Sequence, residues 1–113
     1  MSASKLPPSI PTHIPTLTTK PYKVSLEKDL IQSKNAFGMT NSLTRQVTLD
    51  KSLLESESIL WATFWHEVFH VFLFESGLDN LLKGPVKESL CDAFGTYMTK
   101  AMEEGFIKLD RVK

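Results

Sequence analysis

The chain has 113 residues and a mass of 12.8 kDa, which suits one domain with one hydrophobic core and excludes a second independent domain. Its 42% hydrophobic and 23% charged content is that of an ordinary soluble globular protein. Thirteen basic residues balance thirteen acidic ones, so no basic field is available to bind nucleic acid by bulk electrostatics. The one cysteine, Cys91, excludes an internal disulfide and a two-cysteine zinc knuckle, so any metal site must use histidine, aspartate or glutamate.

Residues 1–11 are predicted to form an extended arm, because five of the six prolines fall within the first 21 residues and proline disfavours helix and central strand. The arm lacks the apolar run of about 7–15 residues that a secretory signal needs, and with a single cysteine in the chain we expect a cytoplasmic protein. The most apolar stretch, residues 59–74, is shorter than the roughly 20 uncharged residues of a membrane span, and it therefore predicts a core helix.

Alternating apolar and polar residues predict two β-hairpins, over residues 13–26 and 36–50, with turns at residues 20–21 and 41–42. Together the hairpins predict a small antiparallel sheet with one buried face. Residues 25–34, between them, fit either a loop or one helical turn.

Two long helices are predicted in the second half of the chain, where the hydrophobic period changes from two to 3.6. The first covers about residues 56–76 and ends at Gly77. The second covers residues 86–104, with Pro85 in its first turn and Gly105 after its end.

These elements predict an α+β domain over residues 12–105, in which the sheet packs on the two helices. The tail, residues 106–113, alternates in polarity and fits either a strand or a docked extension.

A narrow polar stripe runs along the first long helix. Between residues 59 and 74 twelve residues are apolar, and the other four stand at positions i, i+3, i+4 and i+7: Thr63, His66, Glu67 and His70. At about 100° per residue these four share one side of the helix. A buried, unpaired carboxylate costs several kcal/mol, so a compensating group is expected beside the stripe.

Residues 66–70 read HEVFH, the HExxH pattern. Two histidines four residues apart on a helix can converge on one zinc ion, with each nitrogen about 2.0–2.1 Å from it. Glu67 then lies beside the metal, where a general base takes a proton from water. The pattern predicts one zinc ion per chain, with His66 and His70 as ligands.

A third ligand must come from an acidic residue, because no histidine follows His70. Glu88 and Asp92 share a face of the second helix, which Gly95 continues. We predict that Glu88 ligates the metal and that Asp92 hydrogen-bonds the free nitrogen of a ligating histidine. Gly95 would let the two helices approach closely. The alternative is that Glu88 only complements the helix dipole and Asp92 is a solvated charge.

HExxH at residues 66–70, followed by Glu88 and Asp92 in Glu-x-x-x-Asp spacing, resembles the gluzincin metallopeptidases. Its size and order of elements are similar to those of the minimal members: the minigluzincins, small phage-encoded metallopeptidases and the ImmA/IrrE-like group. The resemblance covers roughly residues 12–104 and implies a minimal zincin fold and peptidase activity. In this class the strand before the active-site helix binds extended substrate by edge pairing, which implies that role here for Arg45, Gln46, Val47, Thr48 and Leu49.

Other residues offer weaker signals. The resemblance implies an oxyanion-stabilising histidine or tyrosine, for which only Tyr22 and Tyr97 can be suggested. Cys91 adjoins Asp92 and could approach the metal, although a lone helical cysteine is more often a small core residue. Two further hypotheses are that the arm brings His13 to the metal as a ligand and that the tail with Asp110 blocks the site.

We therefore expect hydrolysis of a peptide or protein substrate, with Glu67 as general base and zinc held by His66, His70 and Glu88. The alternative is a non-catalytic zinc-binding regulatory or interaction module with the same fold. A structural zinc site prefers four protein ligands, whereas the sequence offers three and a base, which favours the enzyme. Neither function calls for nucleic acid or a membrane, and the oligomeric state is left open.

Overall fold

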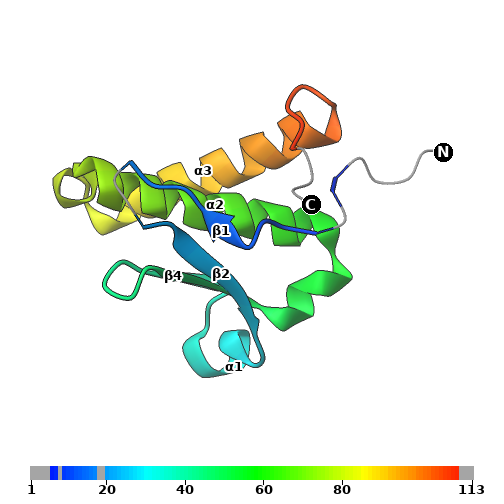
Figure 1. Ribbon diagram of the computed structural model, residues 1–113, viewed down its shortest axis with the longest axis horizontal. Helices are drawn as coiled ribbons and strands as arrows, with labels where there is room; N and C mark the ends of the chain where they lie inside the picture. The colour runs from blue at the N-terminus through cyan, green and yellow to red at the C-terminus, as the bar shows by residue number, and fades with distance from the viewer. Residues whose placement is uncertain (1–5, 8, 18–19, 110–113) are drawn as a thin grey trace.

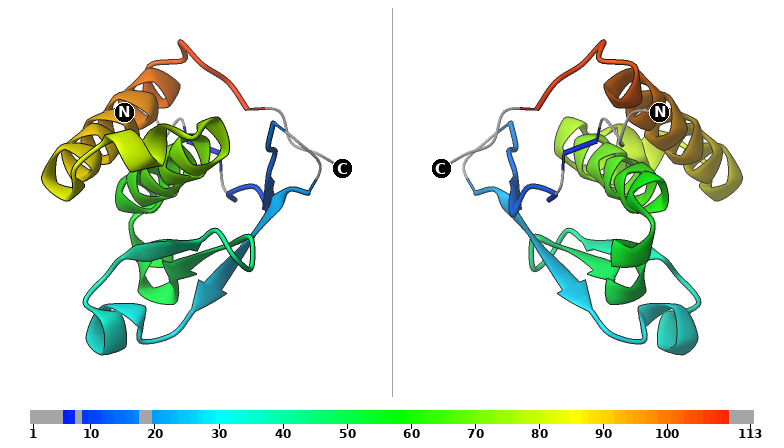
Figure 2. Two further views of the ribbon diagram at one scale, coloured as in Figure 1. Left: turned by 90° about the vertical axis from the view of Figure 1, so that its left-hand side faces the viewer. Right: turned by 90° about the vertical axis from the view of Figure 1, so that its right-hand side faces the viewer.

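Two long helices lie side by side over a small sheet in the computed structural model, which describes residues 6–7, 9–17 and 20–109 (Figures 1 and 2). In chain order its strands and α-helices are β1 (His13–Ile14), β2 (Tyr22–Glu27), α1 (Leu30–Lys34), β3 (Gly38–Asn41), β4 (Gln46–Asp50), α2 (Glu57–Ser76) and α3 (Gly84–Glu103). Short 3-10 helices, η1 (Lys51–Glu55) and η2 (Leu78–Leu81), precede α2 and α3. The predicted α+β class is confirmed.

The sheet differs from the predicted one in its strand order. Both hairpins are present, because β1 pairs antiparallel with β2 and β3 pairs antiparallel with β4. In the described part of the chain, however, the order is β1-β2-β4-β3, and the central pair β2 and β4 is parallel, with Val24 opposite Val47. The prediction of a wholly antiparallel sheet is therefore wrong. The chain passes through α1 to the far edge of the sheet before β3 begins, so β4 returns between β3 and β2 and runs parallel to β2.

The undecided segment between the hairpins holds the end of β2 and the short helix α1. Leu30 is buried, and the backbone N–H of Ile31 donates to Asp50 Oδ2 at 2.7 Å. The other carboxylate oxygen of Asp50 accepts from the backbone N–H of Ser52 at 2.8 Å. Asp50 therefore ties α1 to the end of β4 and starts the turn that leads into α2.

The core lies between the sheet and α2. Val47 and Leu49 of β4 are fully buried, and Trp61 and Phe64 of α2 pack in the same cluster. Tyr22 of β2 is also buried there. Because β4 is the central strand, its alternate side chains reach the middle of α2, which fixes the polar stripe of that helix relative to the sheet.

Both predicted long helices are confirmed. Gly77, with φ 80°, ends α2 in the left-handed conformation that glycine adopts without strain. Pro85 lies in the first turn of α3, and Gly105, with φ 77°, follows its end. No helix among the described residues has the length and apolar character needed to cross a membrane.

Parts of both ends pack on this core. Leu6 of the predicted arm is buried, and the indole N–H of Trp61 donates to the carbonyl oxygen of Pro7 at 3.2 Å. In the predicted tail, Ile107 and Leu109 are partly buried against the core, and residues 106–109 form no strand. That part of the tail is a docked extension.

Candidate metal and catalytic site

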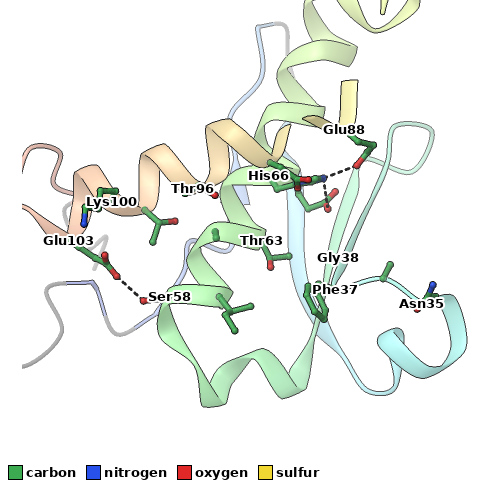
Figure 3. A pocket seen from close by; sticks show the side chains of 16 residues that line it. Asn35, Phe37, Gly38, Ser58, Thr63, His66, Glu88, Thr96, Lys100 and Glu103 are labelled. Atoms are coloured by element: carbon green, nitrogen blue, oxygen red, sulfur yellow. Dashed lines mark hydrogen bonds and ion pairs between the residues drawn. The ribbon is translucent and has the colours of Figure 1, made fainter. Parts of the chain in front are cut away.

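The polar stripe of α2 faces two neighbours, α3 on one side and β3 on the other (Figure 3). Thr63 and Glu67 are buried, whereas His66 and His70 are partly accessible. The compensating groups that buried polar side chains require therefore come from α3 for the histidines and from β3 for Glu67.

Glu88 bridges the two histidines. Its Oε1 lies 3.2 Å from His66 Nε2 and its Oε2 lies 3.1 Å from His70 Nε2. Donors about 2.0–2.1 Å from a tetrahedral zinc ion are separated from one another by roughly 3.3 Å. Both separations are close to that value, and each is made by a different carboxylate oxygen of Glu88.

Asp92 occupies the predicted place behind His66. Its Oδ1 lies 2.8 Å from His66 Nδ1, while His66 Nε2 faces Glu88. A proton on Nδ1 shared with a carboxylate leaves the lone pair of Nε2 free for a metal. The spacing of Glu88 and Asp92, one helical turn apart, is what lets one helix serve both nitrogens of the same ring.

The close approach of the helices depends on Gly95. A Cβ at this position would lie 2.4 Å from the backbone oxygen of Ala62 and 3.2 Å from the backbone nitrogen of His66. Only glycine fits so near a neighbouring backbone. The prediction that Gly95 permits close helix packing is confirmed, and this packing brings Glu88 and Asp92 within reach of α2.

Glu67, the predicted general base, has a partner that the sequence did not reveal. Its side chain is 6% exposed, and Thr40 Oγ1 of β3 donates to its Oε1 at 2.6 Å. Oε2 lies 4.0 Å from His66 Nε2, on the side of the histidines. Burial raises the pKa of Glu67, and the hydrogen bond from Thr40 and the nearby histidines partly offset that rise. Thr40 therefore holds one oxygen of Glu67 while the other faces the histidines.

Gly38, two residues before Thr40, is the second contribution of β3. A Cβ there would lie 3.1 Å from Thr63 Cγ2 and 3.2 Å from Glu67 Cγ, so only a very small residue lets β3 approach α2 so closely. Neither Gly38 nor Thr40 carried a sequence signal, because glycine and threonine are common in strands and turns. Only the pairing of β3 with β4 makes their position evident.

A cavity of about 670 Å³ opens beside this cluster. Its walls come from α2, from α3 and from residues 35–38. Figure 3 shows His66 and Glu88 toward one end and Ser58 and Glu103 toward the other, where the hydroxyl of Ser58 donates to Glu103 at 2.7 Å. The cavity is large enough for several residues of an extended peptide.

β4 is an interior strand and not the free edge that the sequence predicts for residues 45–49. It is paired on both sides, with β2 and with β3. That prediction is therefore wrong, because an interior strand has no unpaired backbone groups to offer. In the described part of the chain the free edge nearest α2 belongs to β3.

The outward groups of β3 follow from its register. The backbone N–H of Asp50 donates to the oxygen of Phe37, which makes this a hydrogen-bonded pair. Because such pairs alternate along an antiparallel ladder, the N–H and C=O groups of Gly38 and Thr40 point away from β4. These groups face the open edge of the sheet.

The expectation that a metal site here can use only histidine, aspartate or glutamate does not hold, because Cys91 lies beside His66 and His70. It is fully buried, and its sulfur and one ring nitrogen of each of His66 and His70 all lie within 4.8 Å of one another. Burial, together with the carboxylates of Glu88, Glu67 and Asp92, raises the pKa of Cys91 to about 12. The thiol is therefore protonated at neutral pH unless a cation binds it.

The other residues considered lie elsewhere. His13 is exposed on β1, at the opposite edge of the sheet from β3. Tyr22 is buried in the core, and Tyr97 is 62% exposed and does not line the cavity. Asp110 lies outside the described residues. The structure thus brings together the five predicted residues on α2 and α3 and separates them from the two tyrosines and His13.

In comparisons with known proteins, no family model, no curated protein sequence and no solved structure matches this chain.

Proposed function

We propose that this protein is a zinc-dependent metallopeptidase of gluzincin type, with one zinc ion held by His66, His70 and Glu88. The observation that carries the proposal is the position of Glu88, whose two oxygens lie 3.2 and 3.1 Å from the Nε2 atoms of the two histidines. Glu67 adds a buried carboxylate beside these donors. Three ligands and an adjacent base make up a catalytic zinc site with an open position.

A zinc ion held by His66, His70 and Glu88 would polarise the scissile carbonyl and lower the pKa of water. Glu67 takes a proton from the attacking water and delivers it to the leaving amine nitrogen. The hydrogen bond from Thr40 keeps Glu67 Oε1 fixed, so Oε2 is the oxygen that exchanges the proton. Asp92 holds the proton of His66 on Nδ1 and thereby keeps Nε2 directed at the metal position.

The proposed substrate is a peptide or protein segment in extended conformation. It would pair with the outward backbone groups of Gly38 and Thr40 and lie along the cavity between residues 35–38 and the two helices. Because the Thr40 backbone faces this edge while its side chain holds Glu67, the same residue aligns substrate and base. The cytoplasmic location stays a prediction from composition.

One observation favours the second candidate, a non-catalytic zinc-binding regulatory or interaction module. Cys91 lies near His66 and His70 and could provide a fourth protein ligand. Four protein ligands are typical of structural zinc sites. Glu67 favours the enzyme, because a structural zinc site does not require a buried carboxylate that faces the ligands without binding the ion.

Cleavage of an unstructured protein by zinc-loaded protein tests the proposal. We expect wild type to cleave it, and we expect Glu67→Gln to bind zinc with unchanged stoichiometry and to cleave at least about 100-fold more slowly, as for loss of a general base. Glu57→Gln, in the first turn of the same helix, is the matched control and should cleave like wild type. If zinc-loaded wild type cleaves nothing across a library of unstructured peptides, the peptidase assignment fails and the binding module takes its place.

A further inference from the structure

Cys91 is the buried group at the site that the proposed mechanism does not use. It belongs to α3, three residues after Glu88, so the two side chains project from the same face one helical turn apart. Glu88 reaches the histidines from the solvent side, with 57% of its side chain exposed, whereas Cys91 is fully buried between the helices. Two potential ligands on one helix thus face the same pair of histidines.

Cys91 combines full burial with charged neighbours. It is one of the fully buried apolar residues of the chain. Its charged neighbours are Lys87 and three carboxylates, those of Glu88, Glu67 and Asp92, which belong to the proposed centre. Packing of a small apolar side chain does not by itself explain why a thiol lies beside the carboxylates and histidines of the proposed centre.

The distances allow coordination after a small movement. In a tetrahedral site with Zn–S about 2.3 Å and Zn–N about 2.0–2.1 Å, sulfur and nitrogen are separated by roughly 3.6 Å. The sulfur of Cys91 and one ring nitrogen of each histidine lie within 4.8 Å of one another, so closing the gap takes at most about 1.2 Å. Glu88 contacts Nε2 of both histidines, through a different oxygen for each.

We propose that Cys91 is the fourth protein ligand of this centre, which in its resting state is closed by His66, His70, Glu88 and Cys91. The inference rests on the metal centre of the proposed function. On coordination the thiol loses its proton to solvent and sulfur binds as thiolate, with no change of oxidation state. Hydrolysis then requires the sulfur to leave the ion, or the ion to accept a fifth ligand, before water can bind.

Cobalt(II) provides the test, because it occupies zinc sites and a thiolate ligand gives it a charge-transfer absorption in the near ultraviolet that nitrogen and oxygen ligands do not. The chain has one cysteine, so any such band from the pure protein arises from Cys91. Thiol reductants are replaced by a phosphine to keep other sulfur ligands out. No peptidase activity is needed for this measurement.

We expect stoichiometric cobalt binding by wild type with the charge-transfer band. In Cys91→Ser we expect the visible cobalt spectrum without the band, and a zinc Kd raised at least tenfold, the lower limit for losing even an outer partner of a ligand. Ser89→Ala, at an exposed position two residues away on the same helix, is the matched control and should keep both the band and the zinc Kd of wild type. Stoichiometric cobalt in wild type without the band would overturn the role of Cys91 and leave the three-ligand centre intact. Absence of cobalt binding by folded wild type would overturn both proposals.

Discussion

Replacing Gly95 by alanine tests whether helix packing creates the site. The added Cβ would lie 2.4 Å from the backbone oxygen of Ala62, whereas ordinary contact begins near 3.4 Å, so α3 must move outward by about 1 Å. The obstacle is backbone, which has no rotamer to relieve the clash. Glu88 lies two turns away on the same face, so the movement separates its carboxylate from both histidines.

The expected cost follows from two opposing effects. Overpacking a close contact costs up to about 3 kcal/mol, and alanine gains about 1 kcal/mol over glycine within a helix. We therefore expect Gly95→Ala to lower the free energy of unfolding of the metal-free protein by about 2 kcal/mol. Zinc binding must then draw the displaced helices together again. If this costs about 1.4 kcal/mol of the binding free energy, the Kd for zinc rises about tenfold.

Urea unfolding and zinc titration by chelator competition measure both effects. Ala93→Gly, at an exposed position of the same helix, is the control for intrinsic helix propensity and should lose about 1 kcal/mol without altering zinc affinity. If Gly95→Ala is more stable than wild type and binds zinc equally well, the close approach of α2 and α3 does not position the ligands and the reasoning is refuted.

Three further predictions concern the neighbours of the ligands. Asp92→Asn removes the carboxylate at His66 Nδ1 and should weaken zinc binding about 10–100-fold in the same titration; an unchanged Kd would exclude the outer role of Asp92. Thr40→Val removes a hydrogen bond that lowers the pKa of Glu67, so the acid limb of the kcat/KM profile should move to higher pH, whereas Thr40→Ser should leave it in place. Because burial raises the pKa of Glu67, its contribution to the stability of metal-free wild type should be lost as pH rises from the normal carboxyl pKa through the raised one. Glu67→Gln should lose less stability over the same range. Equal slopes of the free energy of unfolding against pH, measured by urea unfolding between about pH 4 and pH 8, would contradict this.

The helices and the residues they carry could be predicted from sequence because helical spacing is local. His66 and His70 are four residues apart, as are Glu88 and Asp92, and a helix places such pairs on one face whatever surrounds it. Gly77 marked the end of α2 for the same local reason. Once Gly95 allowed the two faces to meet, the predicted residues had to lie together.

The parts that failed depend on contacts between distant segments. The hairpin pattern in the sequence is the same whether β4 lies at an edge or in the interior of the sheet. The position of β4 depends on the path of the chain through α1 between β2 and β3. Because of that crossover, the predicted edge, residues 45–49, lies in the interior of the sheet, and β3 is an edge strand instead. It also placed Thr40 on Glu67, a contact between residues 27 positions apart for which neither residue type gives a signal.

Zinc content measured by mass spectrometry on the purified chain tests the central claim most directly. We expect one zinc ion per wild-type chain, loss of zinc in His66→Ala at the same free-metal concentration, and retention in His13→Ala, whose histidine lies at the far edge of the sheet. Folded wild type that takes up no zinc, or His66→Ala that retains it with wild-type affinity, would contradict the proposed centre.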